Sequence, residues 1–117
     1  MKNLRLVFFG ALAALLAGCG TPRTIYYWGY YEPLVYTMYA TPGKATPEVQ
    51  VMKLEEDLQK AKAKNKPVPP GFHAHLGYLY FQLGKADQAR QEFETEKANF
   101  PESVVFMDRL VANLNKP

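Results

Sequence analysis

The chain has 117 residues, of which 48% are hydrophobic and 21% charged, and its formal net charge is +3. This length is enough for one small domain and excludes a large multidomain protein. The single cysteine excludes a disulfide within the chain.

The first 18 residues are predicted to be an export signal. Lys2 and Arg5 make a positive start, and the apolar run from Leu6 to Leu16 is shorter than the ~20 residues of a membrane-spanning helix. Leu16-Ala17-Gly18-Cys19 resembles the lipobox of bacterial lipoproteins. The resemblance implies cleavage before Cys19 and acyl chains on its sulfur and new amino terminus, which hold the protein on a membrane. An ordinary secretory signal with an incidental cysteine is the alternative.

The residue after the cysteine indicates the destination. In sorting of the enterobacterial kind an aspartate there retains a lipoprotein in the inner membrane, so Gly20 implies the outer membrane. Without residues 1–18 the chain keeps 99 residues, and because Lys2 and Arg5 are removed its formal charge falls from +3 to +1. A nearly neutral envelope protein is not expected to bind nucleic acid.

Residues 19–47 are predicted to be a lipid-anchored tether with a short helix. Six of the eight tyrosines lie between Tyr26 and Tyr39, which is too aromatic for a solvated linker. One interpretation has this segment fold back over one end of the helices, with a short helix from Glu32-Pro33 to Tyr39. The other has an aromatic patch dock on a neighbouring protein or a membrane interface. The candidate binding residues here are Trp28, Tyr30 and Tyr31.

Residues 48–117 are predicted to be a helical domain. Its first helix, over residues 48–66, has an apolar stripe of Val51, Leu54, Leu58 and Ala61. The acids Glu55-Glu56-Asp57 on this helix are expected to face water, as are the lysines at its end.

Two further helices form a hairpin after the breaker Pro67-Val68-Pro69-Pro70-Gly71. Apolar residues recur at helical spacing from Gly71 to Leu83, Gly84 ends this pattern, and a second helix runs from Ala86 to Phe100. The hairpin resembles a tetratricopeptide repeat. The matching residues are Leu76-Gly77, Tyr80, Gly84, Ala89, Phe93 and Pro101, whereas His73 and Glu96 depart from the pattern. Gly77 and Ala89 would allow close approach of the two helices, with Tyr80 turned toward the second; a helical hairpin with chance matches is the alternative.

A single repeat cannot bury both of its faces. Residues 102–114 carry Met107, Leu110, Val111 and Leu114 on one stripe and are expected to cap the hairpin. The predicted fold is therefore all-α: a short tetratricopeptide-like stack of about four helices, after the signal peptide and the Tyr-rich segment.

No catalytic, cofactor or metal site is expected. His73 and His75 point roughly 200° apart around a helix, so they cannot share a metal, and His73 is expected to be a packed core residue. We therefore expect a protein that is not an enzyme.

A partner is expected to bind the first helix of the hairpin. The first helices of such repeats line a concave face. With Leu76, Gly77 and Tyr80 turned toward the second helix, this concave side is left with Tyr78, Phe81 and Gln82, and the two rings lie at i and i+3. Such an exposed aromatic pair is a candidate binding anchor. The alternative is that the Tyr26–Tyr39 segment or the helix from Glu48 covers both rings.

The mature chain resembles the domain-of-unknown-function 4810 family of small bacterial lipoproteins. The most telling stretches are Tyr39–Pro47 (YATPGKATP), Lys66–Gly84 (KPVPPGFHAHLGYLYFQLG) and Phe100–Leu110 (FPESVVFMDRL). The resemblance implies envelope partners, a lipoprotein similar to the curli secretion channel and a second uncharacterised lipoprotein, but no activity.

These observations predict a non-enzymatic outer-membrane lipoprotein that binds other envelope proteins as an adaptor or assembly module. One alternative is a constitutive structural subunit or stability factor of a complex with the curli-channel-like protein. Another is a module that binds cell-wall glycan through exposed aromatic side chains.

Overall fold

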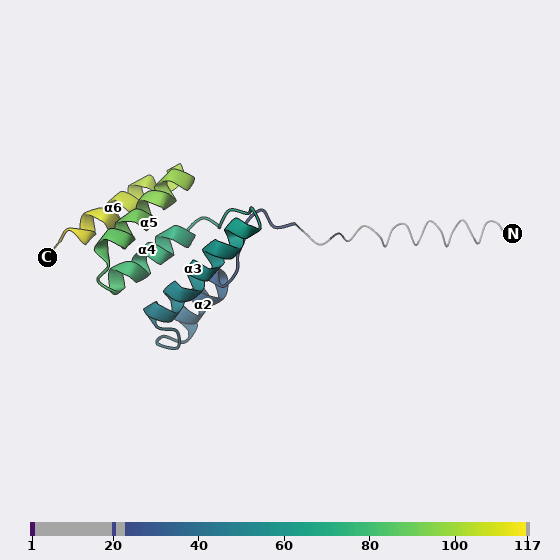
Figure 1. Ribbon diagram of the computed structural model, residues 1–117, viewed down its shortest axis with the longest axis horizontal. Helices are drawn as coiled ribbons and strands as arrows, with labels where there is room; N and C mark the ends of the chain where they lie inside the picture. The colour runs from purple at the N-terminus through teal and green to yellow at the C-terminus, as the bar shows by residue number, and fades with distance from the viewer. Residues whose placement is uncertain (2–19, 21–22, 117) are drawn as a thin grey trace.

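The computed structural model describes Met1, Gly20 and residues 23–116, so the predictions for the export signal and for Cys19 concern residues outside this range. Every regular element in the described residues is helical, which confirms the all-α prediction. In chain order the elements are α2 (Tyr31–Ala40), α3 (Pro47–Ala63), α4 (Phe72–Gln82), α5 (Ala86–Asn99), the short 3-10 turn η1 (Pro101–Ser103) and α6 (Val104–Leu114) (Figure 1). Among these described helices, none has both the length and the apolar character needed to cross a membrane.

Local sequence signals set the ends of these helices. Thr46 caps α3, because its hydroxyl accepts a hydrogen bond from the Val49 amide at 3.5 Å. Pro47 takes the first position of the helix, where the backbone needs no amide hydrogen. Gly84 has φ +71°, a left-handed conformation that ends α4 and lets the chain turn back into α5. The α4–α5 hairpin is thus encoded locally.

The helices are arranged side by side, with α3 against one side of α4, α5 against the other, and α6 beyond α5 (Figure 1). The packing of α4 on α5 is close at Gly77, where an added Cβ would lie 2.6 Å from a ring carbon of Phe93 and 3.1 Å from the Ala89 carbonyl oxygen. The expected close approach of these two helices is therefore confirmed. Each of the α-helices in residues 23–116 contributes side chains to the core, which includes Leu34, Val51, Leu54, Ala61, Phe72, Leu76, Leu79, Tyr80, Ala89, Phe93 and Met107.

The Tyr-rich segment lies against the end of the domain where α3 finishes and α4 begins. The Tyr27 amide donates to the Pro67 carbonyl at 2.8 Å, and Lys66 Nζ donates to the Thr24 carbonyl at 3.2 Å. Tyr31 packs on Phe72, with ring centroids 5.5 Å apart. This segment therefore closes one end of the helical layer, and α2 corresponds to the short helix expected there.

The expectation that Glu55, Glu56 and Asp57 all face water is wrong for Asp57, which is fully buried. Its carboxylate accepts a hydrogen bond from the Tyr30 amide at 2.5 Å, and burial raises its pKa above the ordinary value. Gly29 precedes this contact with φ +47°, and a Cβ at Gly29 would overlap the carboxylate. Asp57 thus joins the Tyr-rich segment to α3, and Gly29 is required for that contact.

Candidate interaction face

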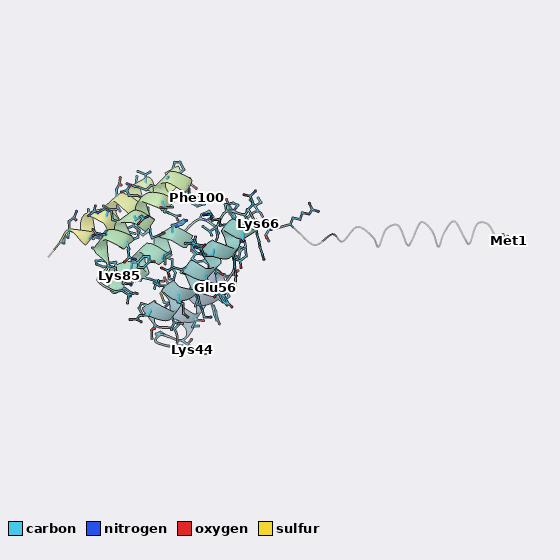
Figure 2. All side chains as sticks on the ribbon, in the orientation of Figure 1. Met1, Lys44, Glu56, Lys66, Lys85 and Phe100 are labelled. Carbon is cyan, nitrogen blue, oxygen red and sulfur yellow. The ribbon has the colours of Figure 1, made fainter. Side chains whose placement is uncertain are left out.

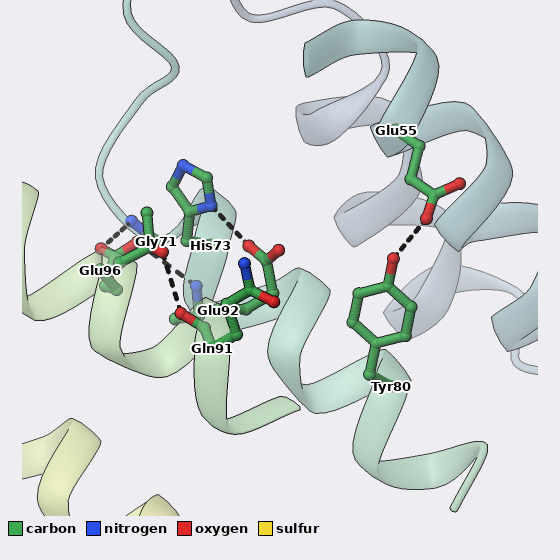
Figure 3. Close-up of polar contacts among 9 residues, drawn as sticks. Glu55, Gly71, His73, Tyr80, Gln91, Glu92 and Glu96 are labelled. Carbon is green, nitrogen blue, oxygen red and sulfur yellow. Dashed lines mark hydrogen bonds and ion pairs between the residues drawn. The ribbon is translucent and has the colours of Figure 1, made fainter. Parts of the chain in front are cut away.

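The position of α4 depends on a carboxylate from α5. The chain enters α4 through Gly71, which has φ +88° and no side chain to cap the helix. Glu96 of α5 instead accepts hydrogen bonds from the Gly71 amide at 2.6 Å and the Ala74 amide at 3.3 Å (Figure 3). Because Glu96 is only 2% exposed, it provides a buried cap that fixes the start of α4 against α5.

Two polar contacts hold α4 between its neighbours. His73 Nδ1 lies 2.6 Å from Glu92 Oε2 on α5, and the Tyr80 hydroxyl donates to Glu55 on α3 (Figure 3). His73 is buried, which confirms its predicted place in the core. Tyr80 differs from the expectation in that its hydroxyl reaches α3, and burial together with the contact to Glu55 raises its pKa. These contacts set how α4 is rotated between α3 and α5.

The rotation of α4 leaves Tyr78 and Phe81 at the surface. Tyr78 is 40% exposed and Phe81 is 46% exposed. Both rings border a hollow of about 230 Å³ whose other walls come from α5 and α6. The complete lining is Tyr78, Phe81, Phe93, Leu110, Asn113 and Leu114. The walls belong to α4, α5 and α6, so neither the Tyr26–Tyr39 segment nor α3 lines this hollow.

The chemistry of this hollow, which we call the Tyr78–Phe81 face, is that of an apolar binding surface. None of its lining residues carries a charge, and Asn113 supplies an amide. Gln82 Nε2 donates to the Tyr78 hydroxyl at 3.1 Å, which holds that ring in place beside the hollow. The three predicted residues of α4 therefore lie together, as their helical spacing requires.

The other predicted binding residues, Trp28, Tyr30 and Tyr31, lie elsewhere. Tyr31 is partly buried against Phe72 and His75, and burial raises its pKa, with the nearby Glu96 adding to the shift. The Trp28 ring stacks on Tyr31, and the Tyr30 ring faces Lys53 Nζ at 4.3 Å. These aromatic residues contact α3 and the start of α4, so they do not form one surface with Tyr78 and Phe81.

The described residues contain no group of three or more His, Cys, Asp or Glu side chains placed to hold a metal ion. His73 and Glu92 form a hydrogen-bonded acid–base pair, but both side chains are largely buried between α4 and α5. This pair is accounted for by the packing of the two helices.

Sequence reasoning missed two parts of this arrangement. It treated Glu96 only as a departure from the repeat pattern, although a carboxylate at that position and a glycine before α4 together could have indicated a cap. It also did not foresee the second role of Leu110 and Leu114 of α6. Both pack against the core, as the predicted capping stripe requires, and both also line the hollow beside Phe81.

In a comparison with known families, the model of a family described as "Domain of unknown function (DUF4810)" matches residues 25–110. No curated protein and no solved structure matches the chain. The matched range includes all of α2 to α5 and most of α6, and thus nearly the whole described domain.

Proposed function

The chain belongs to the DUF4810 family, whose description assigns no function, and we propose from the chain's own residues that it is a non-enzymatic outer-membrane lipoprotein, anchored through Cys19, whose helical domain binds other envelope proteins. The observation that carries the binding function is the Tyr78–Phe81 face. Two large aromatic side chains stand half-exposed over an uncharged hollow.

This face has the features of a protein-binding anchor site. Aromatic rings bury a large area at little cost in side-chain entropy, and they are common among the residues that dominate interface energies. The hollow beside the rings has room for an apolar side chain, while Asn113 in its wall and Gln82, which contacts the Tyr78 hydroxyl, offer amide hydrogen bonds. The partner segment is therefore expected to be apolar at its centre and polar at its edges.

We predict that the double change Tyr78→Ala and Phe81→Ala abolishes partner binding while leaving the fold intact. Both rings are half-exposed, so the melting temperature should change little, whereas loss of two anchors should weaken binding by about 2 kcal/mol or more. The measurement is co-purification from crosslinked membranes, together with thermal unfolding of the purified protein.

The matched control is Tyr36→Ala with Tyr39→Ala, which removes two more exposed rings from the outer face of α2. This control should retain the partner. Equal retention by both double variants would contradict the proposed face, and so would unfolding of the Tyr78/Phe81 variant.

A second candidate function is that of a constitutive subunit in a complex with the curli-channel-like lipoprotein. The observation in its favour is the outer surface of α6, where Val105 and Phe106 are each more than half exposed although both are large and apolar. A permanent partner would cover this surface. A stoichiometric complex that survives dilution would favour this candidate, whereas exchangeable partners would favour the adaptor.

The membrane anchor has its own test. Cys19→Ser removes the thiol that accepts the diacylglycerol, so the precursor should remain uncleaved and unlabelled by a palmitate analogue. Electrophoretic mobility and label incorporation measure both effects. Normal processing with continued labelling would refute the lipoprotein assignment.

A further inference from the structure

We propose that one end of the domain docks on an anionic membrane surface and thereby fixes the orientation of the anchored protein. This surface, the tether-end patch, consists of Arg23, Ile25, Trp28, Lys62, Lys64 and Lys66, all of them exposed. The inference rests on the proposed anchor at Cys19.

The position of the patch follows from where the chain enters the domain. Thr24 is held by Lys66 Nζ at 3.2 Å, and Tyr27 is held by the Pro67 carbonyl at 2.8 Å, both at the end of α3. Only five residue steps separate Cys19 from Thr24, so they span at most roughly 18 Å. An anchor at Cys19 therefore keeps Thr24 within that distance of the bilayer surface, and with it the Lys66 amine that contacts Thr24.

The charge of the patch suits anionic lipid. Lys62, Lys64 and Lys66 project from the last turn of α3 and the residues after it, and the ion pairs of the described residues do not include them. Lys60 differs, because it pairs with Glu56 at 2.6 Å. Attraction between exposed cations and anionic headgroups acts over about 10 Å at 0.1 M salt. The tether is short enough that the lysines can approach the headgroups within this range.

Aromatic and aliphatic side chains are exposed on the segment that is held at this end of the domain. Trp28 is 41% exposed and Ile25 is 76% exposed. A hollow of about 480 Å³ at the same end has Lys62 and Lys66 in its wall next to Tyr26 and Phe100. Cations interleaved with Trp and Tyr are the side chains favoured at the membrane–water interface. The patch therefore combines electrostatic attraction with side chains that suit the headgroup region.

Docking in this way would leave the Tyr78–Phe81 face free. The helix α4 begins at the docked end with Phe72 and runs away from it, so Tyr78 and Phe81 lie roughly 9–14 Å further along its axis. Lys44 and Lys85 lie at the far side of the molecule from Lys66 (Figure 2). The domain would stand on its tether end and present the partner face away from the lipid.

The test uses the lipidated full-length product in vesicles of phosphatidylethanolamine and phosphatidylglycerol, with Trp28, the single tryptophan of the chain, as its probe. Lipids brominated near the headgroup should quench Trp28 fluorescence. The quenching should fall roughly twofold or more in Lys62→Glu/Lys64→Glu, in vesicles of phosphatidylcholine alone, and when salt is raised from about 0.1 M to about 1 M. The matched control, Lys44→Glu/Lys85→Glu, changes the net charge by the same amount. Its Trp28 fluorescence should be quenched as strongly as that of the unaltered protein.

The outcomes separate this inference from the proposed function. If the unaltered protein does not float with vesicles, the anchor is refuted, and this inference with it. If it floats but its quenching is the same in both vesicle types and both double variants, docking of the patch is refuted while the anchor stands. The salt response of the unaltered protein needs no substitution, so a folding defect in a variant cannot decide the result.

Discussion

Glu96→Ala is expected to lower the free energy of unfolding by about 2–3 kcal/mol, because it leaves the first amides of α4 buried without an acceptor. The carboxylate accepts from two of these amides, and at 2% exposure water cannot replace it. Stability of a small domain is itself only about 5–10 kcal/mol. Thermal unfolding should show a fall in melting temperature of roughly 10 °C or more.

Glu94→Ala is the matched control for this change, since Glu94 is on the same helix and pairs with Lys97 at 2.8 Å at an exposed position. Exposed ion pairs contribute at most about 1 kcal/mol, so the melting temperature of this variant should be close to that of the unaltered protein. Glu96→Gln keeps one oxygen acceptor, so its melting temperature should lie between those of Glu96→Ala and Glu94→Ala. If Glu96→Ala were no less stable than Glu94→Ala, the buried cap would not support α4.

Gly77→Leu is expected to destabilise the protein by about 1–3 kcal/mol or more by forcing α4 and α5 apart. Even the first added carbon would lie 2.6 Å from Phe93 and 3.1 Å from the Ala89 carbonyl oxygen, so the backbone of α5 must shift. Gly77→Ala should also be destabilising, although alanine favours a helix by about 1 kcal/mol over glycine. Denaturant unfolding measures both changes.

Ala98→Leu provides the control, because it adds the same side chain at an exposed position of α5 and should leave stability nearly unchanged. The double variant Gly77→Ala/Phe93→Ala should lose less free energy of unfolding than the two single variants lose together. The reason is that the smaller side chain at 93 removes the closest contact. Two results would contradict the described packing of the hairpin. One is that the losses in free energy of unfolding are strictly additive in the double variant, and the other is that Gly77→Leu leaves the denaturant midpoint unaltered.

One of these stability variants also sharpens the test of binding. Glu96 does not line the Tyr78–Phe81 hollow, whereas a side chain at position 77 would press on Phe93, which does line it. Glu96→Ala should therefore lose the partner only under conditions in which the domain unfolds. The Tyr78/Phe81 double variant should lose the partner at temperatures where the domain is folded. This contrast distinguishes a binding face from a general dependence on folding.

The sequence alone determined the helices and much of their packing. Periodic apolar residues such as Val51, Leu54 and Ala61 gave the buried side of α3, and Gly84 and Pro101 marked where the helices of the hairpin end. These signals are local: a helix repeats every 3.6 residues, and glycine and proline limit the backbone wherever they occur. For the same reason helical spacing placed Tyr78 beside Phe81 without knowledge of any other element.

Only the tertiary structure decided which polar groups are buried and which aromatic rings remain exposed. Glu96 reaches Gly71 across 25 residues and Asp57 reaches Tyr30 across 27, and the periodicity of a single helix does not specify partners so distant in the chain. Asp57 lies on the same buried helical stripe as Leu54 and Ala61, yet it was expected in water because the amide that donates to it lies on another segment. Likewise, the exposure of Tyr78 and Phe81 depends on how the contacts of His73 and Tyr80 rotate α4 and on α6 leaving the hollow open. Burial of a charged or polar group is favourable only when its hydrogen-bonding partner is in place, and the folded arrangement of the helices supplies that partner.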